Sequence, residues 1–478
     1  MDSGEPLHVL FFPFLTRSHM IPMLETARLF SENGIKTSIV TTPANADLIK
    51  PLLHHHPSIS LHLIPFPSTT FNLPSGCENL TAVPVHLTTD FFSAAFNLRD
   101  PFSHLLSSLR PDAIISDAIY TWTTELAGEF HIPRVIFQVT GLFPLSATND
   151  LDLHLHHPSY KSISDDSELF SIPGFPHTVH FTRSQLPEVF AFPPMLGWQR
   201  EAELSSHAVI VNSFSALEPD YAVHYSNVAP REVFLLGPVA IAGQPEKKEK
   251  KAEPCLEWLD EKDDGSVVYV GFGTLSRFTA EQIKELAFGL ENSGEGFVWA
   301  VGSGEGFVWA VGSGEAVEWI PDGFEKRVQG RGLVLKGWVP QTEILNHRAV
   351  GGFVCHCGWN SVMEAVVAGV PVITWPLHSE QFVIEKWICE VVKMGIPAWE
   401  GFKSVKDEEK VVFPATAVAA AVKKLMGSGE EVVEMRKRVA ELAKLARMAV
   451  AEGGTSNQDL SRLIDGLVAW RDNHRPIK

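Results

Sequence analysis

The residues from His356 to Ser361 (HCGWNS) have side-chain types and a position that suit the binding of an anion. They follow a strand-like segment that ends at Cys355, and they precede a run typical of a helix. At such a junction, unpaired backbone N–H groups and the positive end of the helix dipole face one point. His356, Asn360 and Ser361 add hydrogen-bond donors, and Thr274 adds another from an earlier Gly-Thr turn. The sequence therefore predicts a site for a diphosphate.

A metal site is the alternative interpretation of the same segment. Cys355 and Cys357 bracket His356 at the end of a strand, but no second cluster of ligands accompanies them. The histidines at positions 54–56 and at 154, 156 and 157 lie in polar, proline-containing stretches that are typical of solvated loops. We therefore predict that the protein has no metal site.

The elements that must position these residues follow an α/β pattern. Leu7–Phe14 (LHVLFFPF) is a continuous apolar run, typical of a strand buried on both faces of a parallel sheet. A helix is expected from about Ile21 to Asn33, with Pro22 in its first turn and Gly34 as its stop. Further strands are predicted at Lys36–Thr42, Ala113–Ser116, Val135–Val139, Ser266–Phe272, Leu333–Lys336, Gly352–Cys355 and Pro371–Trp375, with another helix at Ala280–Glu291. This alternation predicts doubly wound α/β domains.

The first turn excludes one class of enzyme. Residues 14–22 contain no glycine, so the GxGxxG motif that lets the backbone approach a dinucleotide is absent. An NAD-dependent dehydrogenase is therefore a poor interpretation of the α/β pattern.

A polar segment divides the chain into two halves. Residues 242–254 (AGQPEKKEKKAEP) carry almost no apolar side chains, which is typical of a solvated linker. We place one domain at 1–241, a second at 255–455 and a final helix with one apolar stripe at 456–478. Two Rossmann-like halves joined in this way usually bind their ligands in the cleft between them.

An exact duplication interrupts the second half. Residues 293–302 (SGEGFVWAVG) are repeated without a change at 303–312. Two copies with a period of ten do not make a repeat architecture. Because only one FVWAV can fill a given sheet position, the other copy is expected in a surface loop or at a sheet edge. A loop over the ligand cleft and a neutral duplication both remain open.

Composition favours a cytosolic protein with a small-molecule partner. The 478 residues include 39 Lys and Arg against 57 Asp and Glu, a net charge of −18 that disfavours nucleic acids and anionic membranes. Five cysteines, an odd number with no CxxC pair, do not form a disulfide framework. The N-terminus lacks the features of a signal peptide, and the longest apolar run falls short of the roughly 20 residues that span a bilayer.

The 44 residues from Trp338 to Gln381 resemble the donor-binding box of the plant family 1 UDP-sugar-dependent glycosyltransferases. The box reads WVPQTEILNHRAVGGFVCHCGWNSVMEAVVAGVPVITWPLHSEQ, and so many matching positions are far more specific than a lone glycine motif. The donor site that this resemblance implies consists of Thr274, Trp338, Val339, Gln341, His356, Trp359, Asn360, Ser361, Glu364, Glu380 and Gln381.

The resemblance also implies roles for these residues. Trp338 would stack on the uracil ring, and Glu364 would accept hydrogen bonds from the ribose hydroxyls. Trp359, Glu380 and Gln381 would hold the sugar, and in this family a final glutamine goes with glucose. UDP-glucose is thus the implied co-substrate, with no cofactor. Taken singly, Trp338 is more often a core residue and Glu364 part of a solvated helix face.

The acceptor side is implied in the first half. Ser18-His19-Met-Ile-Pro22 resembles the family's Gly-His-x-x-Pro element, whose histidine is the general base, although Ser18 replaces the usual glycine. Asp117 matches the aspartate that pairs with this histidine. Gly271 also departs from the family, which commonly has a serine there. The expected acceptor-lining residues are Phe14, Phe91, Phe92, Tyr120, Phe137, Phe143 and Phe190, although phenylalanines are usually core residues.

Taken over nearly the whole chain, the resemblance implies the GT-B architecture of two facing Rossmann-like domains with an interdomain cleft. The final helix would pack back on the N-terminal domain, and the protein would act as a monomer. The implied reaction is an inverting transfer of glucose to a hydroxyl of a plant small molecule. A flavonoid is the first choice of acceptor and a triterpenoid or steroidal aglycone the second. C-glucosylation, a sugar-nucleotide epimerase and a non-catalytic UDP-sugar-binding protein are the rival interpretations.

Overall fold

The computed structural model describes residues 6–54, 56–155, 165–228, 231–241, 253–301, 319–337 and 339–474. Its contacts divide the chain into two compact units. The N-terminal unit comprises Met1–Leu142, Pro194–Gln244 and Met448–Lys478, and the C-terminal unit comprises Phe143–Pro193 and Pro245–Arg447. The contacts thus group residues 143–193 with the second half, whereas the sequence assigned them to the first. Most of the predicted linker lies outside the described residues, and the domain boundaries stay a prediction.

A parallel sheet forms the centre of the N-terminal unit. In the described part of the chain its strand order is β3-β2-β1-β4-β5-β8-β9, and neighbouring strands pair in parallel. The strands are β1 (His8–Phe12), β2 (Lys36–Thr41), β3 (Ile59–Leu63), β4 (Ala113–Asp117), β5 (Arg134–Gln138), β8 (Ala208–Val211) and β9 (Glu232–Leu235).

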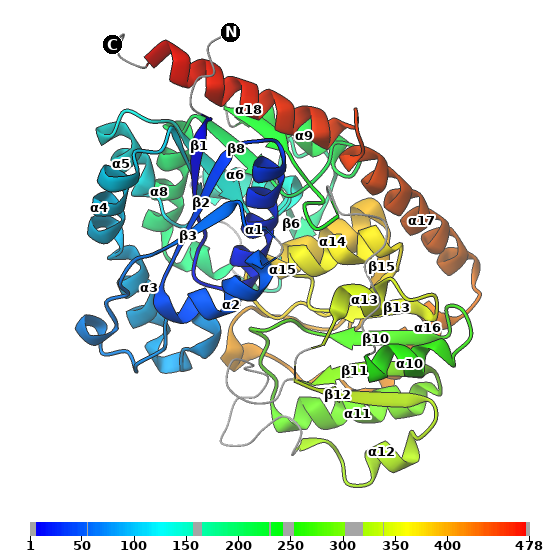
Figure 1. Cartoon of the computed structure of the whole chain (residues 1–478). Coiled ribbons are helices and arrows are strands. Elements are labelled where there is room, and N and C mark those ends of the chain that lie inside the picture. The colour runs from blue at the N-terminus through cyan, green and yellow to red at the C-terminus, as the bar shows by residue number, and fades with distance from the viewer. Residues whose placement is uncertain are drawn as a thin grey trace. The chain divides into compact units, whose positions relative to one another are not determined.

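Helices cover both faces of this sheet, which explains why β1 is buried throughout (Figure 1). Val9 and Phe11 join a core cluster with residues of α1 and α18, whereas Leu10 and Phe12 join another with residues of α3 and α4. The helices of this unit are α1 (Arg17–Glu32), α2 (Pro43–Leu53), η1 (Ser68–Phe71), η2 (Leu80–Ala82), η3 (Val85–Leu87), α3 (Thr88–Phe96), α4 (Arg99–Leu109), α5 (Thr123–Glu129), α8 (Pro193–Leu204), α9 (Pro219–Val228) and α18 (Thr455–His474).

The first helix begins earlier than the sequence predicted. It starts at Arg17 and not near Ile21, so His19 lies in its first turn and Pro22 lies inside the helix. The prediction relied on the tolerance of proline in a first turn, where the N–H groups have no helical partner. Here Pro22 lies one turn further along, and its carbonyl accepts a hydrogen bond from the Thr26 hydroxyl at 2.9 Å.

The C-terminal unit has a second parallel sheet. Its strand order within the described residues is β12-β11-β10-β13-β14-β15. These strands are β10 (Val267–Gly271), β11 (Gly296–Val301), β12 (Gly332–Lys336), β13 (Val350–Cys355), β14 (Val372–Thr374) and β15 (Gly395–Pro397). The first copy of the duplication thus supplies β11, and the second copy lies outside the described residues. Two parallel sheets in Rossmann-like units confirm the predicted α/β class.

Helices and a short antiparallel ribbon complete the C-terminal unit. The helices are α6 (Leu142–Leu155), η4 (Arg183–Gln185), η5 (Glu188–Ala191), α10 (Pro254–Asp260), α11 (Ala280–Ser293), α12 (Phe324–Arg327), α13 (Gln341–Leu345), α14 (Trp359–Ala368), α15 (Gln381–Lys386), the π-helix η7 (Trp387–Val392), η8 (Asp407–Glu409), α16 (Ala415–Met426) and α17 (Glu430–Val450). The ribbon pairs β6 (Phe170–Ser171) with β7 (His180–Phe181).

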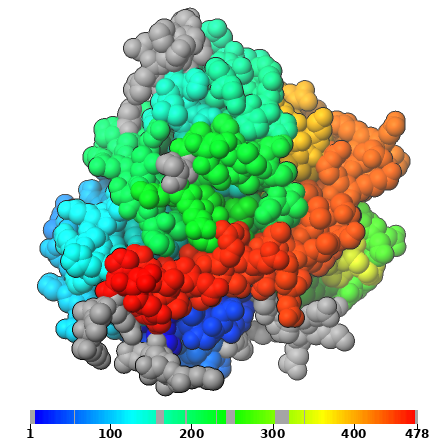
Figure 2. Space-filling model, turned by 90° about the horizontal axis from the view of Figure 1, so that it is seen from above, coloured from blue at the N-terminus to red at the C-terminus, as the bar shows by residue number. Residues whose placement is uncertain are grey.

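The last helix lies on the N-terminal unit. Figure 2 shows α18 (red) as a ridge along the surface beside the green segment that includes α9. Its apolar stripe of Leu460, Leu463 and Leu467 is buried in the core that also contains Phe234 of β9. At its start, the carboxylate of Asp459 accepts a hydrogen bond from the backbone N–H of Leu235 at 2.9 Å. Apolar packing and this polar contact hold the helix to β9.

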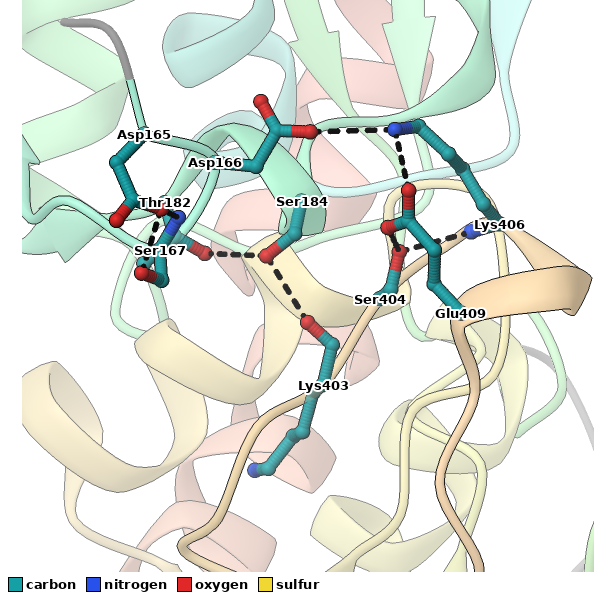
Figure 3. A network of polar contacts seen from close by, with 9 residues as sticks. All are labelled: Asp165, Asp166, Ser167, Thr182, Ser184, Lys403, Ser404, Lys406 and Glu409. Atoms are coloured by element: carbon teal, nitrogen blue, oxygen red, sulfur yellow. Dashed lines mark hydrogen bonds and ion pairs between the residues drawn. The ribbon is translucent and has the colours of Figure 1, made fainter.

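Within the C-terminal unit, hydrogen bonds and an ion pair join residues 165–184 to residues 403–409 (Figure 3). The hydroxyl of Ser184 donates to the carbonyl of Lys403 at 3.0 Å, and its own carbonyl accepts from the N–H of Val405 at 2.8 Å. Lys406 pairs with Asp166 at 3.2 Å. The Lys403 ammonium extends instead to the buried carboxylate of Glu385, with N–O distances of 2.7 and 2.8 Å.

The pair of Lys403 and Glu385 yields a stability prediction. Both side chains are buried, so Glu385→Ala leaves the ammonium without its partner and should cost about 3–5 kcal/mol of unfolding free energy. Urea-induced unfolding of the full chain measures this loss. The control is Glu291→Ala, which breaks a more exposed pair with Arg327 and should cost no more than about 1 kcal/mol. Equal losses in the two variants would contradict the prediction.

Candidate active site

A histidine and an aspartate from distant parts of the chain meet at one edge of the N-terminal sheet. His19 lies in the first turn of α1, just after β1, and Asp117 is the last residue of β4. Because β1 and β4 are parallel neighbours, their carboxyl ends lie side by side. His19 Nδ1 is 2.7 Å from Asp117 Oδ2, and the side chains are 17% and 1% exposed. The structure thus brings the two predicted catalytic residues together.

The geometry of this pair suits general-base chemistry. Because Nδ1 faces the carboxylate, Nε2 on the other side of the ring is the nitrogen that can take a proton from a substrate. The carboxylate fixes the tautomer and stabilises the positive charge that the ring then acquires. Asp117 is itself oriented by the N–H of Ile119 on Oδ1 at 3.1 Å and by the N–H of Phe14 on Oδ2 at 3.4 Å.

Arg134 is a supporting residue that the sequence analysis missed. Its buried guanidinium donates to the hydroxyls of Ser116 at 2.8 Å and Thr124 at 2.6 Å. It also donates to the carbonyls of Asp117 at 3.0 Å and Tyr120 at 3.3 Å. Burial lowers the pKa of Arg134 to about 9, while Asp117 and Glu203 oppose that shift, so the group stays charged at neutral pH. No local sequence pattern indicates an arginine that binds four groups beneath a strand end.

Four of the predicted acceptor-lining rings form one cluster, in which Phe14 contacts the histidine. The Phe14 centroid lies 5.6 Å from that of His19, 5.5 Å from the stacked ring of Phe92, 5.7 Å from Tyr120 and 6.1 Å from Phe91. Burial, and secondly Asp117, raise the pKa of Tyr120, so its hydroxyl stays protonated. That hydroxyl is buried and has no hydrogen-bond partner among the residues the structure describes. The group combines apolar rings with one polar atom beside the base.

The other three predicted rings lie elsewhere. Phe137 is fully buried in the core cluster that contains residues of α1 and α18, on the other face of the sheet from Phe91. Phe143 and Phe190 fall in the C-terminal unit, where Phe143 packs edge-on against Phe175 with centroids 5.4 Å apart. That these three rings line an acceptor pocket stays a prediction.

The predicted strand-to-helix junction lies in the C-terminal unit. Strand β13 ends at Cys355 and α14 begins at Trp359, so the first-turn N–H groups of α14, including that of Asn360, follow the strand directly. Gly271 of β10 is in register with Cys355, which brings the turn that contains Thr274 to the same sheet edge. This arrangement of strand ends and a helix N-terminus suits an anion, and the diphosphate site stays a prediction.

Two glycines define the position of the His356 ring. A Cβ atom at Gly273 would lie 2.8 Å from the ring, and one at Gly358 would lie 2.4 Å from Nε2. Burial, with a smaller effect of His378, lowers the pKa of His356 to about 3. Nδ1 is buried without a hydrogen-bond partner in the described part of the chain. A neutral ring of this kind offers a diphosphate one N–H donor and no formal charge.

The residues expected at the nucleoside share one hydrogen-bond network. The amide nitrogen of Gln341 donates to Glu364 and, at 3.2 Å, to Ser361. The side-chain amide oxygen of Gln341 accepts from the hydroxyl of Tyr269 at 3.1 Å. The Thr342 hydroxyl donates to the carboxylate of Glu364 at 3.2 Å. Burial raises the pKa of Glu364. The structure therefore brings Gln341, Ser361 and Glu364 together, as the resemblance implied.

The same network accounts for Gly271, where the sequence departs from the family. A Cβ at this position would lie 2.8 Å from the hydroxyl oxygen of Tyr269. Cβ atoms in proteins essentially never approach another heavy atom so closely. Glycine therefore leaves room for the tyrosine that binds Gln341. Val339 is half-buried, and its carbonyl accepts from the N–H of Gln341 at 2.9 Å, whereas Trp338 lies outside the described residues.

The residues expected at the sugar lie where α14 and α15 begin. Trp359 is buried and packs against Trp387 with centroids 5.3 Å apart. Glu380 is half-buried at the start of α15, and Gln381 is buried as the first residue of that helix. These residues follow β13 and β14, which are adjacent in the sheet.

Two searches concern metals and membranes. Within the residues described above, no group of three or more His, Cys, Asp or Glu side chains could hold a metal ion. None of the helices in that same part of the chain is both long and apolar enough to cross a lipid bilayer.

Known proteins resemble the chain over almost its full length. The model for UDP-glucoronosyl and UDP-glucosyl transferases matches residues 220–392. UDP-glucose flavonoid 3-O-glucosyltransferase 7 of Fragaria ananassa is 43% identical over 97% of both chains. Scopoletin glucosyltransferase of Nicotiana tabacum is 38% identical over 97% of this chain and 98% of its own.

Solved structures are similar as well. UGT73P12 of Glycyrrhiza uralensis, complexed with glycyrrhetinic acid 3-O-monoglucuronide, has a TM-score of 0.89 and 35% identity and covers 98% of this chain and 97% of its own. UGT71G1 of Medicago truncatula, complexed with UDP-glucose, has a TM-score of 0.78 and 26% identity, with 98% and 99% covered.

The glycines around His356 give a binding prediction. Gly358→Ala should displace the ring and weaken the binding of UDP about tenfold or more, because the added methyl group would lie only 2.4 Å from Nε2. Titration calorimetry with UDP measures the change. Gly466→Ala in α18 is the matched control, since its Cβ would meet nothing within 4 Å. Unchanged affinity in the folded Gly358→Ala protein would contradict this placement of His356.

Proposed function

Because the chain belongs to the plant family 1 UDP-dependent glycosyltransferases, which have the GT-B fold, we propose that it transfers glucose from UDP-glucose to a hydroxyl of a flavonoid. The chain is an enzyme of this family, and the donor sugar and acceptor are the proposal. The observation that carries it is the pair of His19 and Asp117, joined at 2.7 Å beside a group of aromatic rings. Glucose is proposed as the donor sugar because Gln381 is the final glutamine of the donor-binding box, which goes with glucose in this family.

The proposed reaction is a single displacement. His19 Nε2 takes the proton from the acceptor hydroxyl while that oxygen attacks the anomeric carbon. The new C–O bond forms on the face opposite UDP as the bond from the anomeric carbon to the diphosphate oxygen breaks, which yields a β-glucoside. The imidazolium is stabilised by Asp117, and the charge on the departing UDP is stabilised by the first N–H groups of α14 and by His356. UDP-glucose is a co-substrate, and no cofactor takes part.

The acceptor proposal rests on the rings near the base and on the relatives. An aromatic cluster that includes Phe14 and Phe92 beside the base suits an aromatic acceptor, and a relative that is 43% identical is named for a flavonoid substrate. A triterpenoid aglycone is the second candidate, because the Glycyrrhiza uralensis structure contains glycyrrhetinic acid 3-O-monoglucuronide. C-glucosylation of a phenolic ring would use the same base and donor site.

The proposal also includes the cell compartment and the oligomeric state. The five cysteines are free thiols, which supports a reducing compartment such as the cytosol. The reaction needs one donor and one acceptor, and the residues proposed for it come from a single chain. A monomer is therefore the proposed active form.

A panel assay tests the substrates. Purified protein with UDP-glucose should convert flavonoids to products heavier by one hexose, identified by mass and linkage. Release of glucose on acid hydrolysis identifies an O-glucoside, whereas a product that survives hydrolysis would replace O- by C-glucosylation. Faster turnover of triterpenoids than of flavonoids would favour the second acceptor class. Tight UDP-glucose binding without any transfer would favour a non-catalytic binding protein. Isomerisation of the sugar of UDP-glucose would favour an epimerase.

The role of the base can be tested separately. His19→Ala should lower kcat by about 10²- to 10⁴-fold, because the acceptor hydroxyl loses the group that takes its proton. UDP affinity should stay near that of the unmodified protein. His104→Ala removes an exposed histidine of α4 and should leave kcat unchanged. Full activity of His19→Ala on a phenolic acceptor would show that another residue is the base.

A further inference from the structure

The loop of residues 377–381 fixes the orientation of the Gln381 side chain. The loop connects β14 to α15, and Gln381 is only 4% exposed. Its Oε1 accepts hydrogen bonds from the backbone N–H of Leu377 at 2.9 Å and from that of His378 at 3.1 Å. Only the amide oxygen can accept two N–H donors, so the position of the oxygen follows from chemistry. The NH₂ group must therefore point away from the loop backbone.

The NH₂ group of Gln381 lies against the ring of His378. Its Nε2 is 3.2 Å from Nδ1 and 3.4 Å from Nε2 of that ring. Burial lowers the pKa of His378 to about 4, and the charges of Lys410 and Arg277 lower it further, whereas Asp407 opposes the shift. The ring is therefore neutral at physiological pH and has one nitrogen without hydrogen, which can accept from the amide. A hydrogen bond here holds the amide in one rotamer.

Other contacts hold the loop itself. Ser379 has a left-handed backbone with φ of 56°, which is uncommon for a residue other than glycine. Its N–H donates to the carboxylate of Glu188 at 2.8 Å, and its hydroxyl lies 3.2 Å from His378 Nδ1. The N–H of Gln381 donates to the carbonyl of His378 at 3.3 Å. The loop is therefore held by hydrogen bonds to the Gln381 side chain, which belongs to the loop, and by one to Glu188, which lies outside it.

We propose that this loop orients Gln381 so that the amide offers an N–H donor, and not its carbonyl, to the donor sugar, with His378 as the positioning residue. The inference rests on the proposed function, in which Gln381 contacts the glucose of UDP-glucose. An amide NH₂ carries two hydrogens, so one can bind His378 while the other binds a sugar oxygen. The neighbouring Glu380, when ionised, can only accept. Together the two residues present one donor and one acceptor to adjacent sugar hydroxyls.

Gln381→Glu tests which group faces the sugar. A carboxylate has nearly the same shape and can still accept from Leu377 and His378, but it has no N–H. The variant should keep UDP affinity and lose about tenfold or more in kcat/KM for UDP-glucose. Retention of the original kcat/KM would overturn the inference, because an acceptor would then suffice.

His378→Phe tests the positioning role. The substitution keeps the backbone N–H that binds Gln381 but removes the ring nitrogen, so KM for UDP-glucose should rise about three- to tenfold while UDP affinity stays constant. The preference for UDP-glucose over its 4-epimer UDP-galactose should fall, and His378→Asn, which restores an acceptor, should recover part of it. A merely structural role would not change this preference.

Control variants separate the possible failures. His8→Phe removes a buried histidine, bonded to the hydroxyl of Ser38 at 2.9 Å in the N-terminal unit, and should leave sugar preference unchanged. If the unmodified protein transfers no glucose, the proposed function fails. If it transfers glucose but His378→Phe keeps its original preference and KM, only the present inference fails.

Discussion

The hydrogen bond between His19 and Asp117 is the contact on which the proposed catalysis depends. It joins residues 98 positions apart, and it exists because β1 and β4 are parallel neighbours whose carboxyl ends coincide. Asp117 is almost fully buried, and N–H groups, the imidazole and the nearby guanidinium of Arg134 surround it. The sheet order places β1 beside β4, the early start of α1 places His19 in its first turn, and Arg134 binds the backbone carbonyl of Asp117.

Burial sets the charge state of two histidines in the C-terminal unit. His356 and His378 are kept neutral because transfer of an imidazolium from water into their surroundings is unfavourable. Neutral rings act as hydrogen-bond donors or acceptors at fixed positions, which suits recognition of a diphosphate by the backbone N–H groups of α14. The net charge of −18 therefore says little about the proposed donor site, where oriented dipoles and not an excess of lysines would attract the diphosphate.

Local patterns predicted much of the fold because each depends on neighbours in sequence. The apolar run of β1, the strand that ends at Cys355 and the helix over Ala280–Ser293 were predictable from hydrophobic periodicity and turn residues. The start of α1 was not, since proline usually opens a helix and Pro22 lies inside this one. The grouping of residues 143–193 with the second half also depends on contacts with residues 403–409, which no local pattern contains.

The sequence by itself indicated the chemistry proposed for the chain. Residue types at the strand-to-helix junction suggested a diphosphate site, and the resemblance to a known family implied the base and its carboxylate partner. Only the tertiary structure decided how these groups are held. Arg134 beneath Asp117, the two glycines against His356, and the Gln381 amide held by the loop backbone and the His378 ring are contacts between side chains and backbone whose geometry depends on packing. Residue types specify which groups can donate or accept, but packing specifies which of their atoms remain to face a substrate.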